Sequence, residues 1–231
     1  MMVAPPPRPE DLREGRAAFA RFGERMADVH LARFLLRPVD FVDPAHWRAL
    51  KLAPAVVSAM NRAAPFRRAV NAALADLAIG APLVEDHAAA TLRATREGRL
   101  CALLLVAPIE AVDRIAGLIA AAVTSRVVAG LLLSADRKRV RGEMGDEAFD
   151  FAVAEAPLMC ADLTKLAVGR AADIPTPFAD FARHLLIDVV GEIAPPVEPL
   201  FRLRFPTTSQ SFEHPRLTQP HIDQPLRLIL R

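Results

Sequence analysis

The fold class follows from residues 142–169, which read Gly142-Glu-Met-Gly-Asp-Glu-Ala-Phe-Asp-Phe-Ala-Val-Ala-Glu-Ala-Pro-Leu-Met-Cys-Ala-Asp-Leu-Thr-Lys-Leu-Ala-Val-Gly169. Apolar side chains recur there every three or four residues, which is the period of one face of an α-helix. Its members are Phe149, Ala152, Val153, Ala156, Met159, Cys160, Leu163 and Leu166. Proline lacks a backbone N–H and clashes with the preceding turn, so we expect the helix to kink or restart at Pro157.

The helical period continues on both sides of this stretch. Residues 9–30 and 66–79 each carry apolar side chains on one face, and Pro65 stands at the start of the second segment. After residue 176, the pair Thr176-Pro177 predicts a capped helix start. The inward face of that helix is predicted to hold Phe178, Phe181, Ala182, Leu185 and Val189. The pair Pro195-Pro196 then ends it.

Composition supports a mainly α, multi-helix globular protein. Prolines outnumber glycines, 20 to 10, and tyrosine is absent, which suits helices punctuated by proline better than strands joined by glycine turns. Two places alternate instead: Phe201, Leu203 and Phe205, and later Leu226, Leu228 and Leu230. Alternation is typical of strands and allows a short C-terminal β-ribbon. We therefore expect a disordered proline-rich lead-in over 1–8, a helical domain over 9–196, and a proline-rich segment over 197–231 packed on that domain.

Residues 115–133 are long and apolar enough to raise the question of a membrane span. Arg126 lies near the middle of this stretch, and a central arginine costs about 2.5–3.5 kcal/mol on insertion scales. The many alanines and glycines contribute little in return. The sequence therefore predicts two buried helices broken near Thr124, and no direct membrane insertion.

Charge and cysteine content narrow the function classes. The net charge is only +2, from 29 basic and 27 acidic residues, which gives no electrostatic footprint for nucleic acid. Both cysteines, Cys101 and Cys160, have apolar neighbours, so we expect reduced, buried thiols that act as small hydrophobic side chains. Residues 1–10 contain no apolar core of a signal peptide. These features favour a cytoplasmic protein.

Catalytic and metal-binding motifs are scarce. The chain has no glycine-rich phosphate loop, no G-x-S-x-G elbow and no H-E-x-x-H motif. The candidate metal ligands are Glu85-Asp86-His87 and the pair His214 and His221, each more typical of a solvated surface or turn. Glu110 and Asp113 share a helical face, but acidic residues at a helix start usually complement the helix dipole. We expect no cofactor, no metal and no enzymatic activity.

The most irregular stretch lies at residues 34–47 and contains two prolines and two aspartates. Pro38 and Pro44 restrict the residues before them, so the backbone between the prolines is extended or turned. This segment holds Phe41, Asp43 and Trp47, the last being the only tryptophan. Two interpretations remain open for its aromatic side chains. Either these side chains fill space in the hydrophobic core, which we call the core-plug interpretation and favour for Trp47, or they form a partner-binding surface that loses little conformational entropy on association.

One run of charge stands out, Asp136-Arg-Lys-Arg-Val-Arg-Gly-Glu143. It is either a solvated surface between helices or a site for an acidic partner, read by Arg137, Arg139 and Arg141. With acidic residues at both ends, the run is too short for a nucleic-acid groove.

Several stretches together resemble one protein family. Leu35-Leu-Arg-Pro-Val-Asp-Phe-Val-Asp-Pro-Ala-His-Trp47 resembles the N-terminal signature of the K component of type III secretion systems, the cytosolic accessory protein of the sorting platform. Val70-Asn-Ala-Ala-Leu-Ala-Asp-Leu77 is similar to a helix that follows in that family. Residues 100–123 resemble its central helix–turn–helix, and residues 142–153 resemble its glycine-led helix start.

The resemblance implies a non-enzymatic adaptor. Such a protein links the pods, built of the C-ring-like Q component, to the cytoplasmic domain of an inner-membrane ring protein, the D component. Two alternatives stay open from the residues alone. One is a small hydrolase-like enzyme that uses His184 and Asp188, which lie one helical turn apart, and the other is a helical DNA-binding regulator that uses residues 137–141.

Overall fold

The computed structural model describes residues 41–49, 51, 53–63, 94–166 and 174–206, together with positions 25, 28, 29, 32, 66, 69, 70, 90 and 92. Within these residues every regular element is helical, which confirms the predicted mainly α fold class. The predicted lead-in over 1–8 lies outside the described residues, and of the helix predicted over 9–30 only positions 25, 28 and 29 are described, each of them helical.

The first helices in chain order are α2 (Pro44–Ala49), α3 (Pro54–Arg62), α6 (Arg96–Val106) and α7 (Ile109–Ala129). They are followed by α8 (Ser134–Met144), α9 (Asp146–Ala154), α10 (Ala156–Met159) and the short 3-10 helix η2 (Leu163–Leu166). The last described elements are α11 (Phe178–Ile193) and α12 (Glu198–Arg202).

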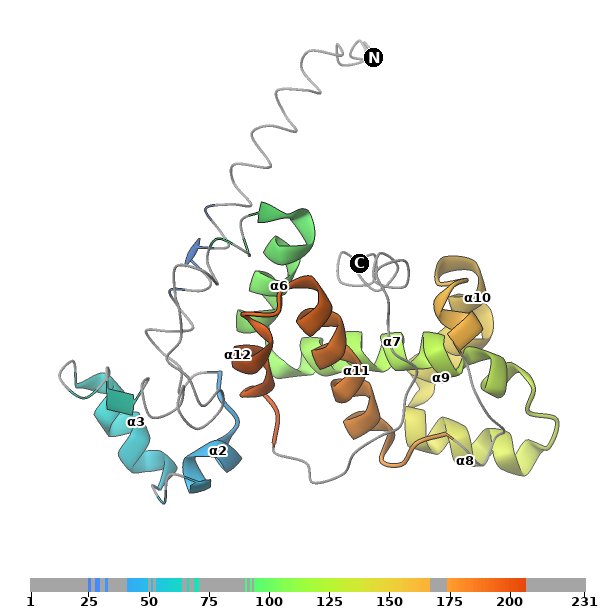
Figure 1. Ribbon diagram of the computed structural model, residues 1–231. Coiled ribbons are helices and arrows are strands. Elements are labelled where there is room, and N and C mark those ends of the chain that lie inside the picture. The colour runs from blue at the N-terminus through green and yellow to red at the C-terminus, as the bar shows by residue number, and fades with distance from the viewer. Residues whose placement is uncertain are drawn as a thin grey trace, which may run out of the picture.

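Helix α7 is the centre of the fold. It runs across the middle of Figure 1, and α11, α9 and η2 all pack against it. Its buried face includes Ala116, Ala120, Ala121 and Ala122, each with no exposed surface. Because alanine side chains are short, neighbouring helices can approach this face closely.

The predicted break near Thr124 does not occur, since α7 is continuous over 21 residues. The Thr124 hydroxyl donates a hydrogen bond to the Ala120 carbonyl one turn earlier, at 2.9 Å, so the polar side chain is accommodated inside the helix. Arg126 is exposed near the end of α7. Within the described part of the chain, no helix combines the length and the apolar composition that crossing a membrane requires.

Proline marks most helix starts, as the sequence indicates. Pro44 and Pro54 begin α2 and α3, and Pro108 precedes α7. Helix α9 ends before Pro157 and α10 restarts the chain there, which confirms the predicted interruption. Helix α11 begins at Phe178, and its N-cap position is Pro177 rather than the predicted Thr176.

The predicted inward faces are largely correct. All five side chains predicted to point inward from α11 are buried. In residues 142–169, so are Phe149, Ala152, Ala156, Cys160 and Leu163. Val153 is 38% exposed, because α9 ends one residue later and α10 does not continue the same helical face. Met159 and Leu166 pack at the edge of the core.

The predicted C-terminal strand is wrong in its first half. Phe201 lies in α12, and its backbone N–H donates to the Val197 carbonyl in a helical hydrogen bond. Glu198 and a following proline provide a favourable helix start, and the chain then turns through Leu203 and Phe205. The alternation is misleading because Arg204, which a strand would expose, is buried with its neighbours. The second half, residues 226–230, lies outside the described residues.

Candidate functional site

The aromatic side chains just before and within α2 pack toward the core. Trp47 is 3% exposed and Val42 is 4% exposed, so both side chains belong to the core. Phe41 is partly buried against the same cluster. Trp47 therefore fits the core-plug interpretation and offers no side chain to a partner. Pro38 lies outside the described residues, and Pro44 is exposed at the start of α2.

Asp43 and His46 attach this segment to the turn after α12. The backbone N–H of Asp43 donates to the Leu203 carbonyl at 2.9 Å, and its carboxylate accepts from the Ala45 N–H at 2.8 Å. A ring nitrogen of His46, Nε2, lies 2.8 Å from the Phe205 carbonyl. Asp43 therefore organises the start of α2 locally, and its carboxylate has a structural role.

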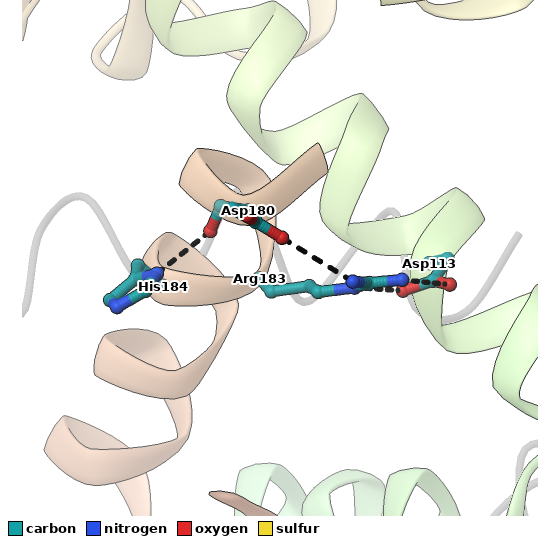
Figure 2. A network of polar contacts seen from close by, with 4 residues as sticks. All are labelled: Asp113, Asp180, Arg183 and His184. Atoms are coloured by element: carbon teal, nitrogen blue, oxygen red, sulfur yellow. Dashed lines mark hydrogen bonds and ion pairs between the residues drawn. The ribbon is translucent and has the colours of Figure 1, made fainter. Parts of the chain in front are cut away.

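A polar network connects α7 and α11, as Figure 2 shows. The Arg183 guanidinium donates to both carboxylate oxygens of Asp113, at 2.8 and 2.9 Å, and lies 3.5 Å from Asp180. The hydrogen bond to Asp113 raises the pKa of Arg183, so this arginine is firmly cationic. Asp113 is thus committed to an ion pair, while Glu110 is exposed; the two do not form the carboxylate pair that their spacing allows.

Beside this network is a cavity of about 90 Å³ lined by His46, Asp180, Arg183, His184, Ile187, Arg202, Phe205 and Pro206. Sites for drug-sized ligands usually measure about 300–1,000 Å³, so this cavity holds only a very small molecule. His184 Nδ1 lies 2.8 Å from the Asp180 carbonyl of its own helix (Figure 2). Asp188 lines a separate, open depression with Gly191 and Glu192. The structure therefore does not bring His184 and Asp188 into one cavity.

The cavity lining is chemically poor for hydrolysis. None of the described residues that line it is a serine, threonine or cysteine, so no hydroxyl or thiol nucleophile faces the two histidines. Its two arginines are already paired, Arg183 with Asp113 and Arg202 with Glu198. The arrangement suits a structural junction of α2, α11 and the turn after α12.

Arg204 is a buried functional group that sequence reasoning missed. Its guanidinium donates to the carbonyls of Leu104 and Ala107 at the C-terminal end of α6. Burial lowers the pKa of Arg204 to about 10. Its Nε has no hydrogen-bond partner among the described residues. The contact satisfies terminal carbonyls that the helix itself leaves open, so Arg204 fastens the α12 turn to α6.

The basic run forms α8, and its arginines have different environments. Arg141 contacts Asp150, lies 3.7 Å from Asp146, and stacks over the Phe149 ring at 4.7 Å, so it ties α8 to α9. Arg139 is exposed on the helix. Arg137 and Lys138 are exposed too, and neither side chain has a hydrogen bond or ion pair with the described residues. Only part of the predicted basic site is thus available as free charge.

Two leucines precede these cations in the chain, separated from them by Ser134, Ala135 and Asp136. Leu132 is 94% exposed and Leu133 is 66% exposed, at the corner where α7 gives way to α8. We call Leu132, Leu133, Arg137 and Lys138 the corner surface. Sequence reasoning missed the leucines because it assigns large aliphatic side chains to the core by default.

The remaining candidates from the sequence are the two cysteines and the possible metal ligands. Cys101 and Cys160 carry buried thiols that form no disulfide with the described residues, as predicted, and burial raises the pKa of the Cys101 thiol to about 12. The possible ligand sets Glu85-Asp86-His87 and His214 with His221 lie outside the described residues. No group of three or more metal-ligating side chains occurs among the residues that the structure does describe.

Comparison of this chain with protein-family models, with curated proteins and with solved structures finds no match.

Proposed function

We propose that this protein is a non-enzymatic cytosolic adaptor of a type III secretion sorting platform. It would link the C-ring-like pod protein, the Q component, to the cytoplasmic domain of the inner-membrane ring protein, the D component. The proposal rests first on the resemblance to the K component, whose stretches follow one another along most of the chain.

The corner surface is the observation that carries a binding role. Exposed apolar patches that are rimmed by polar residues mark sites of association. Leu132 and Leu133 precede Arg137 and Lys138, whose side chains form no hydrogen bond or ion pair with the described residues. A surface of this kind suits recognition of another protein.

The alternatives find less support in the same residues. For a hydrolase, the cavity at His184 lacks a hydroxyl or thiol nucleophile in its described lining. For a DNA-binding regulator, Arg141 is committed to α9, and the carboxylates Asp136 and Glu143 lie on the same short helix. The adaptor therefore remains the function that the described residues support best.

The test is reconstitution with the two named proteins. The purified chain is mixed with the pod protein and with the cytoplasmic domain of the ring protein from the same organism, first singly and then together. Size-exclusion chromatography with light scattering is expected to show a complex with each protein and a ternary complex with both. Failure to bind either protein would refute the adaptor role. Neighbouring genes for a secretion ATPase and its stator would add independent support.

A further inference from the structure

We infer that the corner surface is a docking site for an acidic protein segment that carries an apolar anchor side chain. The inference deepens the proposed function and rests on it, because it specifies the chemistry by which the adaptor holds one of its partners. It is carried by the geometry at the α7–α8 corner together with the charges around it.

The corner surface is held rigidly from behind. Val140 has no exposed surface and Met144 is 8% exposed, so α8 buries one face against its neighbours. Arg141 adds contacts to Asp150 and to the Phe149 ring on α9. A partner would therefore meet a surface that is already ordered, and little conformational entropy would be lost on docking.

The apolar residues precede α8 directly, and the two cations lie in its first two turns. Leu133 is the N-cap residue with extended backbone, and its carbonyl accepts the first-turn hydrogen bond from the Arg137 N–H at 3.1 Å. Lys138 follows Arg137 in the chain. The exposed apolar pair and the two cations therefore belong to the same end of α8.

This combination selects the chemistry of the occupant. The leucines require an apolar side chain to cover them. Arg137 and Lys138, whose side chains have no ion pair among the described residues, favour carboxylates around that side chain. A basic or neutral segment would leave both cations without partners when the surface is covered.

A membrane surface is the less favoured occupant. Anionic lipids bind proteins through larger clusters of lysine and arginine, typically four to eight. The corner surface has two, Arg137 and Lys138.

The experiment compares two surface variants with two matched controls. Leu132→Ser/Leu133→Ser removes the apolar pair, and its control is Leu158→Ser, because Leu158 is 85% exposed on α10. Arg137→Glu/Lys138→Glu reverses the cations. Its control is Arg62→Glu/Arg96→Glu, which makes the same change in net charge at two other exposed positions. Circular dichroism and thermal melting establish that each variant is folded.

Binding is measured by calorimetry and by stopped-flow association with the same pod protein and ring-protein domain. We expect the leucine variant to lose about tenfold or more in affinity for one of the two proteins, as hot-spot residues do. The charge-reversed variant should associate more slowly at low salt, with the difference shrinking at high salt as the charges are screened. Both control variants should bind like the wild-type protein.

The contrary outcomes are distinct. Wild-type protein that binds while both surface variants bind equally well overturns the docking site and leaves the adaptor role intact. Wild-type protein that binds neither probe overturns the proposed function and this inference with it. Binding to phosphatidylglycerol vesicles that is lost in the surface variants, while protein binding is unchanged, would assign the surface to a membrane and overturn the acidic protein partner.

Discussion

Arg183 and Asp113 are separated by 70 residues in sequence, and they join the two longest described helices through a pair of parallel hydrogen bonds. Their side chains are 23% and 35% exposed, so the pair lies at the edge of the core rather than inside it. A bidentate contact in this position restricts how α11 can lie on α7 and so fixes the wall of the small cavity between α11 and α2.

Breaking this pair should destabilise the protein measurably. We expect Arg183→Met to lower the free energy of unfolding by about 1–2 kcal/mol, because solvent screens a pair that is partly exposed and the carboxylate of Asp113 loses its partner. Arg114→Met is the control, because its pair with Glu147 is more than half exposed and solvent screens it, so we expect a clearly smaller loss. Urea denaturation followed by circular dichroism measures both. Equal losses in the two variants would contradict the assigned role of Arg183.

Arg204 should matter far more than its neighbour Arg202. Arg204→Ala leaves a void and removes the donors from two carbonyls at the end of α6, so we expect a loss of about 2–4 kcal/mol in the free energy of unfolding. Arg202→Ala removes a side chain that is 53% exposed and paired only with Glu198 on its own helix, and should cost under about 1 kcal/mol. A larger loss of stability in Arg202→Ala than in Arg204→Ala would contradict the role of Arg204 in holding the turn after α12 against α6.

Arg204 also shows where sequence reasoning stops. Its carbonyl partners lie 100 and 97 residues earlier in the chain, and no local pattern reveals a contact at that separation. Alternation around Arg204 suggested a strand with the arginine outside, whereas the tertiary contact buries it. The cavity is equally non-local, because His46 and Phe205 meet across 159 residues.

Local periodicity, by contrast, was a reliable guide where packing follows one helix face. The inward side chains of α11 and most of those in residues 149–163 were predicted from spacing alone, because burial of one stripe repeats with the helical turn. The predicted break at Thr124 is wrong, because the sequence does not show whether a threonine hydroxyl bonds to a carbonyl of its own helix or ends that helix. The exposure of Leu132 could not be predicted from its residue type, because leucine side chains are usually buried.

The buried thiols should be inert in the folded protein. Burial, with the nearby charge of Glu97 as a smaller cause, raises the pKa of Cys101 to about 12, so almost no thiolate is present at pH 8. We expect iodoacetamide to label Cys101 and Cys160 only after unfolding in urea, as measured by mass spectrometry. Rapid labelling of the native protein at either position would contradict the burial of that thiol.

The raised pKa of Cys101 makes the stability of the folded protein depend on pH in the alkaline range. The folded-state pKa of Cys101 lies above its ordinary value near 9, so between about pH 9 and 12 the native state binds more protons than the unfolded state. Its contribution is therefore fully present below pH 9 and is lost as pH rises toward 12. Cys101→Ala should flatten the alkaline loss of stability relative to the wild-type protein, and an unchanged slope would argue against this contribution.

Phe41 and Trp47 separate the two interpretations of the proline-bounded segment. Trp47 is 3% exposed, and Trp47→Ala should cost about 3–5 kcal/mol, the range for a large aromatic side chain removed from a core. Phe41 packs against the core only in part, so Phe41→Ala should cost less, about 1–3 kcal/mol, or roughly 2–10 °C in Tm for a chain of this size. Differential scanning calorimetry gives both values, and pull-down of the pod protein gives the second readout. A Phe41→Ala variant that melts like the wild-type protein and yet loses the pod protein would make Phe41 an interface residue, because a core plug cannot be removed without a change in melting temperature.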